Sequence, residues 1–232
     1  MIRICILTLI AAVPATATAQ STLEEQLLAV PSAELASQAR ETGDAKRGAV
    51  VFYQPFMACR RCHAVSGESP LGPKLSGQRD GATDEFLVES LLKPSKVIRK
   101  GFETINVVTD EGKVFTGLLV KDTPESVVLR EGRPDGKVIT ILKSDIDEQA
   151  KPQTSIMPAG QVNLLTSRQQ FMDLVKYLIE VRDGGPLKAK ELEPAPQLYQ
   201  IRIPEYEKAI DHAGMIASLD QGAFKRGEAI YN

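Results

Sequence analysis

The feature that most constrains this chain is the segment CRRCH at residues 59–63, which has the form C-x-x-C-H. Two cysteines three positions apart project from one side of a short helical turn, so both can form thioether bonds to the vinyl groups of one porphyrin. His63 then points at the iron from the same side as a proximal ligand. A C-x-x-C pair alone could be a redox dithiol or half a zinc site. The adjacent histidine favours one covalent c-type haem on Cys59 and Cys62.

Residues 1–19 have the pattern of an export signal. Arg3 supplies a positive start, residues 4–13 are apolar, and the sequence ATA at 17–19 is a small-x-small cleavage site. The apolar run is too short to span a bilayer comfortably, so we predict a cleaved signal and no membrane span after it; the alternative is a buried N-terminal helix. Cys5 would leave with the signal. Because c-type haem is attached outside the cytoplasm, both features predict an exported protein, periplasmic or at the cell surface.

The charge of the chain argues against nucleic-acid binding. The 232 residues include 28 Lys and Arg against 30 Asp and Glu, a formal net charge of −2. No basic stripe favours nucleic acid, and no later segment is apolar enough for a membrane.

Helical periodicity predicts a mainly α domain at residues 44–183. The polar segment 20–43 before it forms a leader, either two short helices separated by Pro31 or a partly ordered segment. Caps, apolar spacing and stop signals mark the expected helices. They span residues 23–30 and 32–42 in the leader, then 44–53, 83–92 and a last helix from 166 to the stop at 183–186.

Residues 102–143 have β-branched and alternating character. Turn signals at 110–112 and 132–136 separate the runs, which predicts a small antiparallel sheet of three or four strands inserted in an otherwise helical domain. The insert could be a docking surface or a cover for a haem edge; we favour a structural addition. The expected strands are residues 104–109, 113–120, 126–130 and 137–142.

Residues 184–216 carry several prolines among charged side chains and are interpreted as a linker. The sequence KRGEAIY at 225–231 then echoes KRGAVVF at 46–52. In the first copy Cys59 follows Gly48 by 11 residues, and the second copy stops before such a cysteine. We interpret residues 217–232 as the truncated start of a second cytochrome c domain; chance similarity between two helix starts is the alternative.

Met157 is the candidate for the second axial ligand. It lies in the sequence SIMPAG at 155–160, where Pro158 predicts a rigid loop that can bring a thioether over the iron. Loop methionines often only fill gaps, but the Met-Pro context before the last helix favours a ligand. The remaining methionines are less suited by position: Met57 beside the motif, Met172 in a helix and Met215 beyond the linker.

The imidazole of His63 needs a hydrogen-bond acceptor on its other ring nitrogen, and the carbonyl of Pro73 in the sequence LGPKL is the candidate. His212, the only other histidine, is expected to face solvent on a helix rather than bind iron. Arg60 and Arg61 are expected to face solvent.

The motifs occur in an order that resembles class I c-type cytochrome domains: a K-R-G helix, C-x-x-C-H, G-P-x-L, L-K-P-S, a β insert, S-x-M-P and a final helix. More closely, residues 44–183 resemble the haem-binding domain with a β insert that recurs in exported proteins of planctomycete and verrucomicrobial bacteria. The resemblance implies a cytochrome c-like helical fold, often fused to other haem or dehydrogenase domains. It implies these roles: thioethers on Cys59 and Cys62, iron ligation by His63 and Met157, and a Pro73 carbonyl that orients His63.

We therefore expect an electron-transfer module, more an electron carrier than an enzyme. It would pass one electron at a time through an exposed haem edge to a redox partner protein or a fused redox domain. Ligation by histidine and methionine raises the reduction potential relative to two histidines and closes the iron to substrates. The alternatives are a peroxidase-like haem enzyme with an open or displaceable sixth position, the electron-entry domain of a larger dehydrogenase, and a haem-free thiol–disulfide protein.

Overall fold

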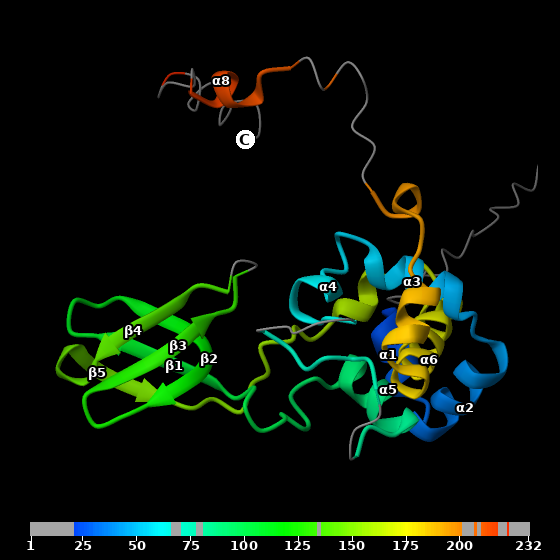
Figure 1. Cartoon of the computed structure of the whole chain (residues 1–232), viewed down its shortest axis with the longest axis horizontal. Coiled ribbons are helices and arrows are strands. Elements are labelled where there is room, and N and C mark those ends of the chain that lie inside the picture. Colours follow the sequence, from blue (N-terminus) through cyan, green and yellow to red (C-terminus); the bar gives the residue numbers. More distant parts are fainter. Residues whose placement is uncertain are drawn as a thin grey trace, which may run out of the picture.

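The computed structural model describes residues 21–65, 71–77, 81–133, 136–200, 207, 210–217 and 222. The predicted signal at 1–19 lies outside these residues, as does nearly all of the predicted repeat at 217–232. Figure 1 shows the helices of residues 23–92 and 168–191 gathered in one unit and the strands of residues 104–150 gathered in a sheet beside it. Two chain segments, residues 93–103 and 151–160, connect the sheet to the helical unit.

The predicted helices begin within two residues of their expected starts, because side-chain caps fix where they begin. Thr22, Asp44, Thr83 and Ser167 each accept a hydrogen bond from the backbone N–H three residues later. The helices are α1 (Leu23–Leu28), α2 (Ser32–Thr42), α3 (Ala45–Tyr53), α4 (Cys59–Cys62), α5 (Asp84–Leu92), α6 (Arg168–Glu191) and α8 (His212–Ala217), with short 3-10 turns η1 (Lys143–Asp145), η2 (Gln161–Leu164) and η3 (Pro196–Leu198).

The core of the helical unit forms where α3 crosses α6. Gly48 permits the close approach, since a Cβ atom there would lie 1.9 Å from the carbonyl oxygen of Asp173. Phe52 of α3 then packs against Tyr177 of α6, with ring centroids 5.2 Å apart. The leader helices α1 and α2 contribute fully buried side chains, including Leu35, to the same core.

The helix α6 bends where the sequence predicted a stop. Gly185 has φ 66° and ψ −158°, outside helical geometry, and Pro186 follows it. A further helical stretch then continues to Glu191, within the segment interpreted as a linker. Ala189 in this stretch and Leu192 directly after it are buried in the helical core. The chain therefore stays packed on the helical unit well beyond residue 184.

The sheet is an antiparallel meander with its own core. Its strand order is β4-β3-β2-β1-β5, so the last strand returns to pair with the first. Ile105, Val107, Val127, Leu129 and Ile141 are buried together in an apolar cluster separate from that of the helices. The strands are β1 (Thr104–Thr109), β2 (Val114–Asp122), β3 (Ser126–Glu131), β4 (Val138–Leu142) and β5 (Ile146–Ala150).

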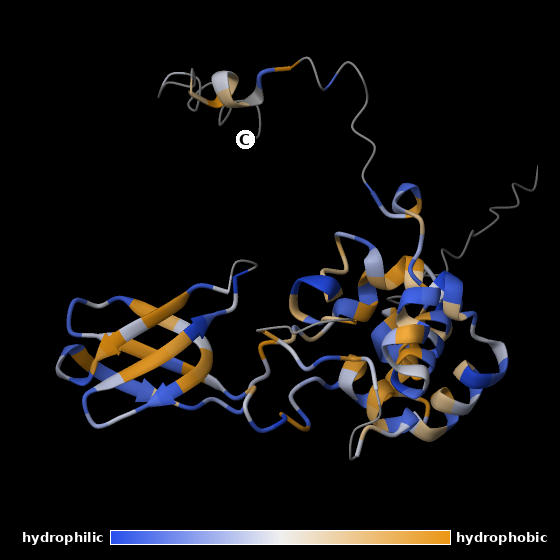
Figure 2. Ribbon diagram, viewed as in Figure 1, coloured by the Kyte–Doolittle hydropathy of each residue, from blue (hydrophilic) through white to orange (hydrophobic). Residues whose placement is uncertain are grey.

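The expectation of a mainly α, cytochrome c-like helical fold is wrong. The structure is 45% helix and 17% strand, and five antiparallel strands form the sheet, so the fold is a mixture of α and β. The four predicted strands are present, but β5 has the sequence IDEQA, with little apolar alternation to reveal it. The sheet buries an apolar core of its own and is therefore described as a second structural unit. Figure 2 shows apolar residues in both units.

Candidate functional site

The motif CRRCH lies in the single-turn helix α4, with His63 at its C-terminal end. Ala58, just before Cys59, has φ 55°, in the left-handed region that residues with a side chain rarely adopt. Such a conformation persists only where surrounding contacts hold it, and here buried Met57 anchors the preceding turn. Between α3 and α4 the chain turns, with backbone hydrogen bonds from Met57 to the Gln54 carbonyl and from Ala58 to the Pro55 carbonyl, each at 3.2 Å.

The imidazole of His63 is held through Nδ1, which lies 2.9 Å from the carbonyl oxygen of Pro73. A carbonyl oxygen can only accept, so Nδ1 carries the proton and Nε2 is the nitrogen with the lone pair that a metal needs. Gly72 allows the loop to come this close. A Cβ atom on Gly72 would lie 2.9 Å from both Nδ1 and Cε1 of His63.

The five predicted site residues line a single cavity of about 340 Å³, a volume typical of small-molecule sites. The cavity is bounded by α4, the 71–75 loop, α5, α6 and both segments that connect the sheet. Most of its lining is apolar, and few polar side chains reach it. The lining includes Cys59, Cys62, His63, Pro73 and Met157 together with Phe52, Leu71, Phe86, Leu87, Leu91, Val97, Phe102, Ile156, Leu174 and Leu178.

Sequence reasoning missed the apolar walls of the cavity. Phe86, Leu87 and Leu91 line the cavity, but in the sequence they fit equally well the apolar face of a helix that packs in a core. Gly132 also lines the cavity, although it belongs to the loop between β3 and β4. Nothing in the local sequence marks such a residue, because only the placement of the sheet brings it there.

Met57, Met172 and Met215 do not line this cavity. The side chain of His212, expected to face solvent, lies outside the part of the chain that the structure describes. Met57 and Met172 are buried in the helical core, at 1% and 3% exposure. Met215 is 60% exposed on α8, the helix that His212 begins. Among the described residues, His63 and Met157 are thus the histidine and the methionine that share the cavity.

The two thiols do not form a disulfide with each other. Burial is the main cause that raises the pKa of Cys59 to about 12, and it also raises the pKa of Cys62, although nearby Arg61 opposes that shift. The thiolate is the nucleophile in disulfide exchange, so a thiol with the pKa of Cys59 is a poor redox group near neutral pH.

Two arginines of the motif are exposed next to the cavity. Arg61 lines the cavity directly, whereas the guanidinium of Arg60 lies 4.2 Å from the ring centroid of Tyr53 and 5.7 Å from that of Tyr199. Stacking on aromatic rings holds an exposed arginine in place.

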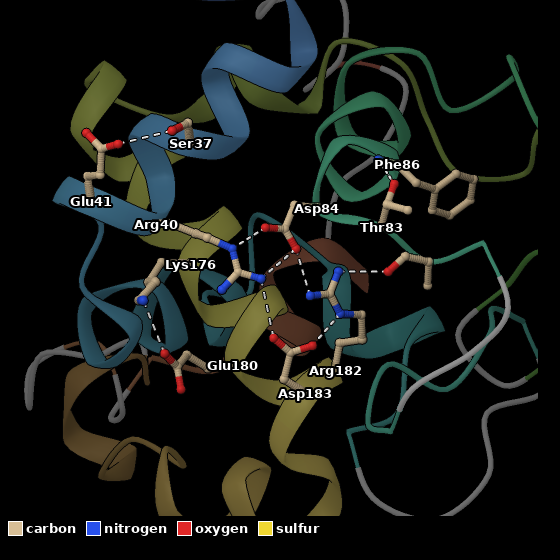
Figure 3. A network of polar contacts seen from close by, with 11 residues as sticks. Ser37, Arg40, Glu41, Thr83, Asp84, Phe86, Lys176, Glu180, Arg182 and Asp183 are labelled. Carbon is tan, nitrogen blue, oxygen red and sulfur yellow. Dashed lines mark hydrogen bonds and ion pairs between the residues drawn. The ribbon is translucent and has the colours of Figure 1, made fainter.

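A network of charged side chains fixes the helix α5, which forms one wall of the cavity (Figure 3). Arg182, 8% exposed, donates to Asp84 and Asp183 and to the Ala82 carbonyl, each at 2.7 Å. Arg40 of α2 donates to the same two carboxylates. Burial alone would raise the pKa of Asp84, but hydrogen bonds from the two arginines outweigh it and lower this pKa.

A scan against models of protein families finds no match to this chain, and a search of curated proteins finds none either. Within the described residues, no group of three or more His, Cys, Asp or Glu side chains is arranged to hold a metal ion directly. Haem does not require such a group, because the porphyrin itself supplies four iron ligands. Nor does any helix in the described part of the chain have the length and apolar character to cross a membrane.

Proposed function

We propose that the chain is a c-type haem module that transfers single electrons. Cys59 and Cys62 would carry the thioether bonds, and His63 and Met157 would ligate the iron. The supporting observation is that two thiols, an imidazole protonated on Nδ1 and a thioether line one apolar cavity. A donor set of this composition in an apolar cavity suits a covalent haem better than it suits a zinc ion or a redox dithiol.

When bound, the haem supplies an iron that cycles between the ferrous and ferric states. The residues of the chain hold and tune it. The Pro73 carbonyl keeps the proton on Nδ1 of His63. Nε2 therefore keeps the lone pair with which it would ligate the iron. Met157 offers a soft sulfur that favours ferrous iron. Apolar side chains from α5 and α6 exclude water and limit the reorganisation that accompanies a change of charge.

The low reactivity expected of Cys59 argues against a thiol–disulfide function. Its pKa, raised to about 12 by burial, leaves little thiolate near pH 7. Covalent attachment during export would consume both thiols. The same proposal includes an exported location and a redox partner protein or fused redox domain as the acceptor.

The test is haem attachment. The full chain is expressed in a host with haem-attachment machinery, purified and extracted with acidified acetone. We expect the haem to stay on the protein and to give a pyridine haemochrome of the c type. The double variant Cys59→Ala/Cys62→Ala should lose covalent haem. His212→Ala, the matched control for His63→Ala, should keep it. Haem that extracts freely from the wild-type protein would overturn the proposal.

Binding of carbon monoxide to the reduced protein separates an electron carrier from a haem enzyme. A carrier with Met157 on the iron binds carbon monoxide slowly, because the sulfur must leave first. Met157→Ala should then bind it rapidly. Rapid binding by the wild-type protein would instead support an enzyme with an open sixth position.

A further inference from the structure

The Met157 loop is held by two consecutive hydrogen bonds to serine hydroxyls. The backbone N–H of Met157 donates to Oγ of Ser155 at 3.1 Å. The backbone N–H of Ser155 donates in turn to Oγ of Ser95 at 3.0 Å. Residues 151–160 form no helix or strand, so these bonds replace the backbone pairing that secondary structure would supply.

These bonds join the two segments that connect the sheet to the helical unit. Ser95 lies on the segment that enters the sheet, and Ser155 lies on the segment that leaves it. Both segments line the cavity, through Val97 on one side and Met157 on the other. The bond between the two serines therefore ties the Met157 loop to a second wall of the same cavity.

Contacts on either side of Met157 show that its loop is fixed by distant parts of the chain. Gly132 of the β3–β4 loop approaches so closely that a Cβ atom there would lie 2.8 Å from Cδ1 of Ile156. On the other side, Nε2 of Gln161 donates to the carbonyl of Met57 at 3.0 Å, two residues before Cys59. The loop is thus tied to the sheet at one end and to the α4 turn at the other.

We propose that Ser95 and Ser155 are positioning residues that keep the thioether of Met157 at the sixth position of the iron. The inference rests on the proposed function. It adds the residues that determine how large a fraction of the protein has Met157 away from the iron. Without either hydroxyl the loop gains conformations in which Met157 leaves the cavity. A typical hydrogen bond contributes about 1 kcal/mol, which corresponds to roughly a fivefold increase in the open fraction.

The experiment measures carbon monoxide binding to the reduced, haem-loaded full chain. Ser155→Ala and Ser95→Ala should each bind it about fivefold faster than the wild-type protein. Both should also have a lower reduction potential, because loss of sulfur ligation favours ferric iron. Ser155→Thr keeps a hydroxyl and should restore the wild-type rate. Ser144→Ala, which removes an exposed hydroxyl bonded to Asp145 on the sheet, is the matched control and should change neither quantity.

The outcomes separate this inference from the function on which it rests. In one outcome, covalent haem forms and Met157→Ala opens the sixth position, but both serine variants bind carbon monoxide at the wild-type rate. The positioning role is then wrong, and the electron-transfer function stands. If Ser155→Thr is as fast as Ser155→Ala, the hydroxyl is not the cause and the inference fails. If the wild-type protein lacks covalent haem, or binds carbon monoxide as fast as Met157→Ala, both proposals fall.

Discussion

Single residues set the geometry around His63. The Pro73 carbonyl fixes which ring nitrogen carries the proton, and Gly72 leaves the space for that carbonyl to approach. Both effects come from the backbone and from the absence of a side chain. The sequence LGPKL named the Pro73 carbonyl as a candidate acceptor, whereas the close approach of Gly72 to the imidazole is visible only in the structure.

The change Gly72→Ala should disturb the proximal side of the site. The new methyl group would lie 2.9 Å from Nδ1 and Cε1 of His63, so the imidazole or the loop must shift and the bond to Pro73 weakens. We expect a changed haem absorption spectrum and a shifted reduction potential, measured on the purified haem-loaded protein. Pro73→Ala is the control, because it keeps the backbone carbonyl that accepts the bond. A spectrum and potential equal to those of the wild-type protein would show that His63 is not confined in this way.

At the scale of elements, charged pairs hold the helix α5 against α2 and α6. Asp84 and Asp183 receive hydrogen bonds from Arg182 and Arg40, and these bonds lower the pKa of both carboxyl groups, although burial opposes the shift. A carboxyl group with a lowered pKa in the folded state stabilises that state when it is ionised. The stabilisation from this carboxyl group is fully present above its pKa in the unfolded chain. It is lost as the pH falls through the lowered pKa of the folded state.

Acid should therefore destabilise the helical unit through this network. We expect the free energy of unfolding to fall as the pH drops below about 5, where the unfolded carboxyl groups begin to take up protons. Denaturant titrations between pH 7 and pH 2 measure it. Asp84→Asn should be less stable at pH 7 and should lose less stability on acidification. A variant with the same pH dependence as the wild-type protein would exclude Asp84 as a source of the effect.

The whole molecule has two hydrophobic cores, one in the helical unit and one in the sheet. The helical core includes Phe171 and Leu174, and the sheet core includes Val107 and Leu129. The connecting segments meet at the cavity, so the site lies where the two units join. Units with separate cores can open independently of each other, and their stabilities need not be equal.

Truncation of a buried side chain in one unit should leave the amide groups of the other unit protected from hydrogen exchange. Leu129 is fully buried in the sheet core, and Leu129→Ala should destabilise the sheet by about 2–5 kcal/mol. Native-state hydrogen exchange should show faster exchange in β1 to β4 and unchanged exchange in α3 and α6. Equal loss of protection in the helices would mean that the two cores form one cooperative unit.

Sequence patterns were enough to identify the candidate donor atoms and most of the local structure. The C-x-x-C-H spacing names its donor atoms, and capping residues such as Asp44 and Thr83 mark where helices begin. These features depend on neighbours within about four positions, which the sequence displays directly. Four of the five strands were predictable for the same reason, because apolar alternation is local.

The fold class and the walls of the site depend on contacts between distant parts of the chain. The polar strand β5 forms because β1 offers it a paired edge, and no local pattern predicts that partner. Likewise Gly132 reaches the cavity and Ser95 reaches Ser155 across 60 positions of sequence. Such contacts arise from burying two apolar cores at once, and their geometry is a property of the packed chain, not of any segment within it.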